Sequence, residues 1–147
     1  MTPLNLRKHA PRGPRETLLG FYFLLRTIDK LRAELPGGSL GEYLNHDRGF
    51  SAYVIRRLGL DMNDLRRVVA QAADENAVAS WLAARIDLTA APQLNAKLET
   101  FVVERMSGED QILVRERHPV MATRRDLSKI LDILAADDAL AFSSSSR

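Results

Sequence analysis

Hydrophobic periodicity is the feature that most constrains the fold, because every strong apolar pattern in the chain repeats with the period of a helix. The longest pattern runs from Pro14 to Leu35. The Gly13-Pro14 pair favours a start here, since the missing N–H of a proline would be unpaired in a first helical turn anyway. Pro36-Gly37-Gly38 favours a stop, because these residues do not continue a helix. We therefore predict a first helix over residues 14–35.

The remaining patterns predict an all-α protein. Further helices are expected at residues 48–58, 61–72, 75–86, 91–106 and 121–136, with Asp47, Asp61 and Asp74 as N-terminal caps of the first three. The segment 111–117 is open to either a short helix or an extended link. Residues 1–13 are expected to form an extended arm and residues 143–147 a disordered, serine-rich tail. The prediction is a single compact helical domain over residues 14–142, with about five to seven helices.

The predicted first helix is apolar around most of its circumference but has one polar side. At about 100° per residue, the groups on that side fall together. They are Arg15, Tyr22, Arg26 and Asp29, with Lys30 beside them. A helix that is apolar nearly all round is usually buried on most sides, so these groups are expected at a rim or paired inside the fold. Arg26 and Asp29 are three residues apart and can pair, whereas Lys30 needs an acid such as Glu42 or Asp47.

This polar side allows three interpretations. It is an ordinary solvated face, an ion-pair network that only fixes helix packing, or a polar pocket. The pocket would be lined by Arg15, Tyr22, Arg26, Asp29, Lys30, Glu42 and Tyr43. Clustered Arg, Asp and Tyr side chains in an apolar wall are what a small anionic ligand needs. Asp29 with Tyr22 or Tyr43 would also suit acid–base chemistry if it is buried, so the sequence leaves open whether the protein is an enzyme.

The same part of the chain resembles a known family. Its residues are Pro11-Arg12-Gly13-Pro14-Arg15, Leu18, Gly20, Leu24, Arg26, Asp29-Lys30, Arg32-Ala33 and Gly41-Glu42-Tyr43. As a compound motif they are similar to the opening of a bacterial family known as domain of unknown function 5069. The similarity continues more weakly through Leu58-Gly59-Leu60 and Trp81.

The chain departs from the family pattern at several positions. Gly13 stands where serine is usual, Leu19 replaces the first glycine of a pair, and Phe21 replaces a tyrosine. A cysteine-proline pair expected soon after Tyr43 is absent. The resemblance implies a small helical protein, and it implies no activity.

The composition excludes several kinds of site. The 147 residues include no cysteine, which removes disulfides and thiolate chemistry and is compatible with the reducing cytoplasm, where we expect the protein. His9, His46 and His118 are far apart in sequence and lie in loop-like surroundings, so no metal site is predicted. No nucleophile elbow and no glycine-rich phosphate loop occurs, and no cofactor is predicted. No segment approaches the roughly 20 apolar residues of a membrane span.

Three function classes follow, and the first is preferred. It is a small-molecule or anion-binding domain that uses the polar side of the first helix. The second is a non-catalytic protein-interaction or homo-oligomer-forming module, with the polar residues paired among themselves and an apolar patch exposed elsewhere. The third, nucleic-acid binding, would use Arg56, Arg57, Arg66 and Arg67. It is less favoured because the net charge is only +2 and acidic residues interleave with these arginines.

Overall fold

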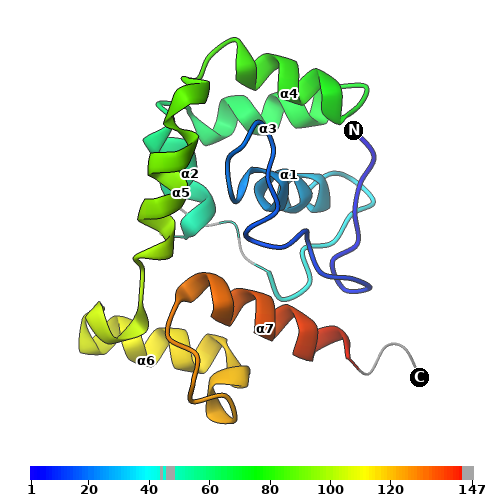
Figure 1. Cartoon of the computed structure of the whole chain (residues 1–147). Coiled ribbons are helices and arrows are strands. Elements are labelled where there is room, and N and C mark those ends of the chain that lie inside the picture. Colours follow the sequence, from blue (N-terminus) through cyan, green and yellow to red (C-terminus); the bar gives the residue numbers. More distant parts are fainter. Residues whose placement is uncertain (44, 46–48, 144–147) are drawn as a thin grey trace. The chain divides into compact units, whose positions relative to one another are not determined.

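The computed structural model describes residues 1–43, 45 and 49–143, which form helices joined by turns (Figure 1). The α-helices are α1 (Leu24–Ala33), α2 (Phe50–Arg57), α3 (Met62–Gln71), α4 (Glu75–Ala83), α5 (Ala91–Glu99), α6 (Gly108–Arg117) and α7 (Ile130–Phe142). The 3-10 helices are η1 (Leu88–Ala90), η2 (Val103–Arg105) and η3 (Pro119–Ala122). Within the described residues only isolated β-bridges occur, without a sheet. The predicted all-α class is confirmed.

The chain divides into two compact units, residues 1–94 and 95–147, and the boundary falls within α5. In the first unit α1 packs against α2 and α3, and α3 packs against α4 (Figure 1). In the second unit η3 packs against both α6 and α7, and α6 also contacts η2. The predicted limits of the helical domain, residues 14–142, remain a prediction. In the described part of the chain, each helix is too short or too polar to cross a membrane.

The first helix begins at Leu24 and not at Pro14, so its predicted start was wrong. Leu19, Gly20 and Phe23 have positive φ angles of 55°, 84° and 71°, which a right-handed helix cannot contain. The backbone instead folds into a tight turn, in which Leu18 and Phe21 exchange N–H···O hydrogen bonds of 3.1 and 3.0 Å. Its end was predicted well, since the observed last residue, Ala33, lies two residues before Leu35.

Burial of two aromatic rings explains why this strained turn persists. Left-handed backbone costs a non-glycine residue roughly 1–2 kcal/mol. Phe21 and Phe23 are 0% and 2% exposed, and burying a phenylalanine side chain contributes about 1.5–3 kcal/mol. The turn places both rings in the core, whereas a continued helix would separate them by about 200°.

Helix caps predicted from sequence are present at α3 and α4. The Asp61 carboxylate accepts hydrogen bonds from the N–H groups of Asn63 and Asp64, and Asp74 accepts one from Ala77. Asp47, the cap predicted for the preceding helix, lies outside the described residues. The predicted tail also lies outside them, apart from residue 143.

The second unit differs most from the predicted helix limits. The helix expected over residues 91–106 ends at Glu99, and the last helix occupies 130–142 rather than 121–136. Both changes have one cause. The backbone pairs two extended segments, with hydrogen bonds from Val103 N–H to Ser128 O and from Ile130 N–H to Phe101 O, both 3.0 Å. The undecided segment 111–117 belongs to α6, whose first turn is capped by the Ser107 hydroxyl.

The core of the first unit surrounds α1. Its fully buried side chains are Leu6, Phe21, Leu24, Ile28, Leu31, Val54, Ile55, Leu65, Val69, Val78 and Leu82. Leu6 belongs to the N-terminal arm, which is therefore part of the packed structure. The arm is held by hydrogen bonds from Leu6 N–H to Ser39 O at 2.8 Å and from Ser39 N–H to Leu4 O at 2.9 Å.

The close approach of the arm to the end of α1 predicts that Gly38→Ala destabilises the protein by about 1–3 kcal/mol. A Cβ atom at Gly38 would lie 2.6 Å from the Ala33 carbonyl oxygen and 2.9 Å from the Leu4 carbonyl oxygen, and backbone cannot give way easily. Gly108→Ala is the matched control, because its Cβ would meet no atom within 4 Å. In urea unfolding this control should gain up to about 1 kcal/mol from reduced chain entropy. A Gly38→Ala protein as stable as the wild type would contradict the packing described.

Candidate functional site

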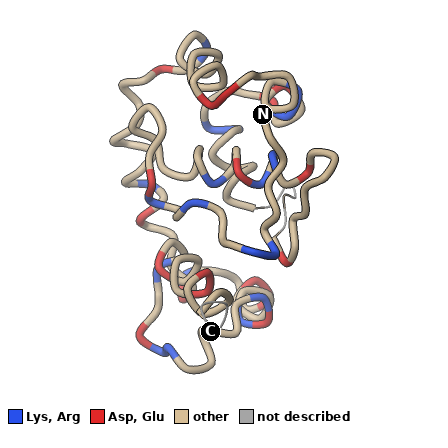
Figure 2. The backbone as a smooth tube through the Cα atoms, turned by 90° about the vertical axis from the view of Figure 1, so that its right-hand side faces the viewer, with Lys and Arg blue, Asp and Glu red and all other residues tan. Residues whose placement is uncertain are grey.

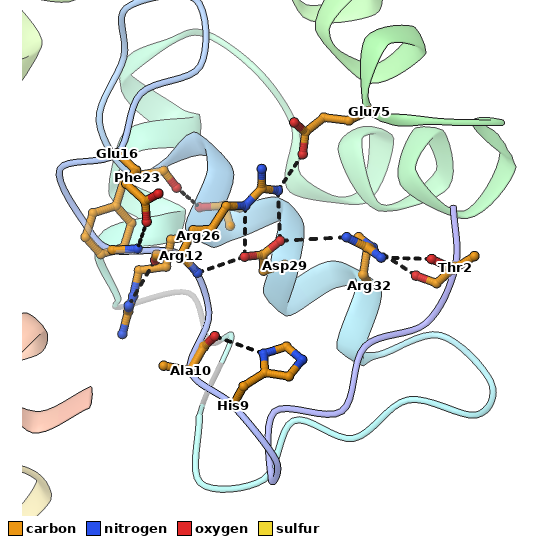
Figure 3. Close-up of polar contacts among 12 residues, drawn as sticks. Thr2, His9, Ala10, Arg12, Glu16, Phe23, Arg26, Asp29, Arg32 and Glu75 are labelled. Carbon is orange, nitrogen blue, oxygen red and sulfur yellow. Dashed lines mark hydrogen bonds and ion pairs between the residues drawn. The ribbon is translucent and has the colours of Figure 1, made fainter. Parts of the chain in front are cut away.

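The Asp29 carboxylate on α1 is the centre of the polar network in the first unit (Figure 3). It accepts three hydrogen bonds from Arg12, one each from the backbone N–H at 2.8 Å, from Nε at 3.1 Å and from Nη2 at 2.9 Å. The same guanidinium donates to Glu75 in the first turn of α4. Asp29 is only 4% exposed, whereas the side chains of Arg12 and Glu75 are 30% and 33% exposed, so the carboxylate end of the network is the buried part. Arg12 therefore joins the arm to both α1 and α4.

A second arginine fastens the beginning of the arm to the same helix. Arg32 donates from Nε and Nη2 to the backbone oxygen and hydroxyl of Thr2, both at 2.8 Å. Its Nη1 atom also lies 4.0 Å from Asp29 Oδ1. Asp29 thus faces two guanidinium groups, as Figure 3 shows.

The charge of Arg12 is stable at any physiological pH. Burial alone would lower the pKa of its guanidinium, but hydrogen bonds to Glu75 and Asp29 and the attraction of both carboxylates outweigh burial and raise the pKa. A raised pKa means that the pairing contributes its full stability below the ordinary arginine value, and that this is lost only as pH rises through the folded value. Loss of the Arg12 charge therefore cannot switch the network in the neutral range.

Two further cations on α1 lie among aromatic rings. Arg26 and Lys30 are 3% and 7% exposed. The Arg26 Cζ atom lies 5.9 Å from the centroid of the Phe23 ring and 5.5 Å from that of Tyr43, and Lys30 Nζ lies 5.9 Å from the Phe23 centroid. Such contacts contribute roughly 0.5–2 kcal/mol each. We call Phe23, Arg26, Lys30 and Tyr43 the cation–aromatic cluster.

The predicted site residues divide into four groups. Arg26, Lys30 and Tyr43 come together in the cation–aromatic cluster. Asp29 lies on the same helix and is held by Arg12. Arg15 and Tyr22 are half-buried in the turns before α1, and not on the helix as predicted, because α1 begins only at Leu24. Glu42 is exposed. Asp47, the other acid predicted to pair with Lys30, lies outside the described residues.

Sequence reasoning missed the two residues that complete the network, Arg12 and Glu75. Arg12 is 17 residues from Asp29 and Glu75 is 63 residues from Arg12, so no helical spacing connects them. The only signal was the presence of Arg12 in the compound motif of residues 11–15. At the sequence level Glu75 stood out only as the first residue of the helix predicted over residues 75–86.

Two of the four arginines proposed for nucleic-acid binding are paired with acidic residues. Arg66 Nε is 2.8 Å from Glu34 Oε2, and Arg67 pairs with Asp64. Figure 2 shows acidic and basic residues interspersed along the chain, which weakens the field that a phosphate backbone would meet. Among the described residues, His, Asp and Glu side chains do not gather in a group of three or more that could hold a metal ion. The nucleic-acid alternative remains a prediction.

We expect Asp29→Asn to destabilise the protein by about 2–3 kcal/mol, because the buried carboxylate that accepts three hydrogen bonds from Arg12 loses its charge and one of its acceptor oxygens. The control is Arg67→Ala, which breaks an ion pair whose side chains are 66% and 49% exposed and should change stability by less than about 1 kcal/mol. Guanidinium chloride unfolding of the two variants measures the difference. Equal effects of the two substitutions would show that the network contributes no more than a surface pair.

Comparison with known proteins identifies the family to which the chain belongs. No curated protein matches the chain. The family described as "Domain of unknown function (DUF5069)" matches residues 8–140, a range that contains Arg12, Asp29 and Glu75 as well as the cation–aromatic cluster. The resemblance found in the first third of the sequence is thereby confirmed and extends over nearly the whole chain. The protein belongs to the family of domains of unknown function DUF5069.

Proposed function

We propose that the protein binds a small anionic ligand through the cation–aromatic cluster. The observation that carries this proposal is the burial of Arg26 and Lys30, one helical turn apart on α1, at 3% and 7% exposure. Removing a cation from water costs several kcal/mol before any compensating interaction. An anion that binds between two such cations gains strong electrostatic attraction, because little water is present to screen it.

The chemistry of the cluster suits an oxyanion. Arginine presents a planar fork that matches carboxylate or phosphate oxygens, and lysine supplies a compact point charge. Tyr43 is half-buried, and its ring lies beside Arg26. The Phe23 and Tyr43 rings add apolar surface of the kind that lines ligand sites. The proposal allows both cations to keep protein partners, since their guanidinium and ammonium groups carry five and three N–H donors.

The geometry supports binding more than catalysis. Asp29 was the predicted acid–base group, but Arg12 occupies its carboxylate oxygens with three hydrogen bonds. This engagement also offsets the negative charge that would otherwise repel an anion from the neighbouring Arg26. We therefore propose a binding domain, located in the cytoplasm in keeping with its lack of cysteine.

A second candidate function is a non-catalytic interaction or homo-oligomer-forming module. The observation that favours it is α6, which buries none of its residues and exposes Ile112 and Leu113 at 59% and 49%. Adjacent exposed apolar side chains are typical of interaction surfaces. Self-association would appear as a molar mass that rises with concentration in light scattering and falls back to 16.5 kDa in the Ile112→Ser, Leu113→Ser double variant. A constant 16.5 kDa for the wild type would contradict self-association.

The anion-binding proposal predicts that inorganic phosphate or citrate raises the melting temperature of the wild type, since a ligand at 100 times its Kd stabilises by about 2.7 kcal/mol. Lys30→Met should weaken binding at least about tenfold, because it keeps the side-chain length but removes a charged donor whose hydrogen bond contributes about 1.5–3 kcal/mol. Isothermal titration calorimetry measures both affinities.

Arg67→Gln is the matched control, because it removes one positive charge from an exposed position. The control should bind the anions as the wild type does. If neither phosphate nor citrate binds the wild type, or if Lys30→Met binds them with unchanged affinity, the cluster is not the site.

A further inference from the structure

The second unit contains an open hollow of about 490 Å3, which lies among η2, α6, η3 and the turn that leads to α7. Its charged lining consists of Arg115, Arg124, Arg125 and Glu104, and its apolar lining includes Met121 and Leu127. The volume falls within the range of roughly 300–1,000 Å3 typical of small-molecule sites. We propose that this arginine-lined hollow is a second binding site, for a small organic anion that combines a phosphate or carboxylate with a short apolar group.

Two of the three arginines have unused hydrogen-bonding capacity. Arg125 makes no hydrogen bond and no ion pair with any residue that the structure describes. Arg115 lies near enough to Glu104 for attraction between their charges, but among the described residues no hydrogen bond joins them. Both guanidinium groups can therefore offer their donors to an oxyanion without first breaking a bond within the protein.

The third arginine is held in place before any ligand arrives. Arg124 donates from Nε to Asp126 Oδ1 and from Nη2 to Asp126 Oδ2, both at 2.9 Å. This bidentate pairing raises the pKa of Arg124 and lowers the pKa of Asp126, so both stay charged at neutral pH. Only two of the five N–H donors of the guanidinium are used in it. The other three donors remain available to a ligand.

Glu104 limits which anions fit. The Ser128 hydroxyl donates to Glu104 Oε2 at 2.6 Å, and this bond, supported by the attraction of Arg115, lowers the pKa of the carboxyl group. Glu104 is therefore ionised at neutral pH, and it repels a compact polyanion. The backbone hydrogen bond from Val103 N–H to Ser128 O holds Glu104 beside the turn that carries Arg124 and Arg125. A ligand with one anionic head and an apolar body meets the arginines, Met121 and Leu127 together.

The test uses the full chain and three probes, namely phenyl phosphate, inorganic phosphate and a single-stranded oligonucleotide. We expect saturable binding of phenyl phosphate, which is at least severalfold tighter than that of inorganic phosphate, because a phenyl group adds buried apolar area. Arg115→Gln and Arg125→Gln should each weaken phenyl phosphate binding about tenfold, as expected for a lost hydrogen bond to a charged group. Calorimetry, together with NMR shifts of the surrounding amides, provides the measurement.

Charge-matched controls distinguish binding at the hollow from non-specific electrostatic attraction to the protein. Arg117→Gln removes an exposed charge from the same helix outside the lining of the hollow and should leave affinity unchanged. Glu104→Gln should strengthen phenyl phosphate binding severalfold, whereas Glu109→Gln, outside the lining, should not. Circular dichroism of each variant checks folding.

Three outcomes would overturn the assignment. The first is binding that does not saturate, and the second is an equal loss in Arg117→Gln and Arg125→Gln. The third is an oligonucleotide that binds more tightly than phenyl phosphate, which would point to nucleic acid instead. Lys30→Met should leave phenyl phosphate affinity at the hollow unchanged. The proposal for the hollow can therefore fail independently of the proposal for the cation–aromatic cluster on α1.

Discussion

The first unit depends on one interaction, the pairing of the buried Asp29 carboxylate with Arg12. Asp29 is 4% exposed, and a carboxylate at such a position is tolerated only when donors satisfy it. Arg12 supplies three of them and reaches Glu75 on α4 with the same guanidinium. A contact between residues so far apart in sequence fixes the arm, α1 and α4 against one another. The arm is thus as much a part of the folded unit as the helices are.

The same residue links this network to the proposed ligand site. The backbone oxygen of Arg12 accepts a hydrogen bond from Arg26 Nη1 at 3.3 Å, while its N–H and side chain hold Asp29. Arg26 is thereby placed next to the Phe23 and Tyr43 rings. In this arrangement the carboxylate of Asp29 is engaged by Arg12, and two cations of α1, Arg26 and Lys30, lie beside aromatic rings. The proposal therefore assigns a structural role to Asp29 and a ligand-binding role to Arg26 and Lys30, which are neighbours on one helix.

Sequence reasoning predicted what depends on local chemistry. The all-α class and the caps of α3 and α4 follow from short-range patterns, and Asp61 and Asp74 occupy the expected positions. The start of α1 was missed, because the left-handed backbone at Leu19 and Phe23 is stabilised by burial of rings and not by local preference. The limits of α5 and α7 were missed because the segments around Val103 and Ser128 pair across 25 residues.

The candidate site was predicted only in part, because a sequence shows which residues are neighbours on a helix but not which distant residues meet in the fold. Residues one turn apart on a helix, such as Arg26 and Lys30, can be grouped from periodicity alone. The pairing of Arg12 with Asp29 and Glu75 cannot, because it is created only when the arm folds back. The arginines of the second unit also gave no pattern, since Arg115 reaches the hollow from α6 and Arg125 from the turn that leads to α7.

Native-state hydrogen exchange of the arm tests the central claim most directly. The amide of Arg12 donates to Asp29 at 2.8 Å and that of Leu6 donates to Ser39 O at 2.8 Å. If the arm is fastened through Asp29, both amides should exchange with the opening free energy of α1, and Asp29→Asn should accelerate their exchange more than that of α3. Arm amides that exchange at the rate of an unfolded peptide in the wild type would contradict the account.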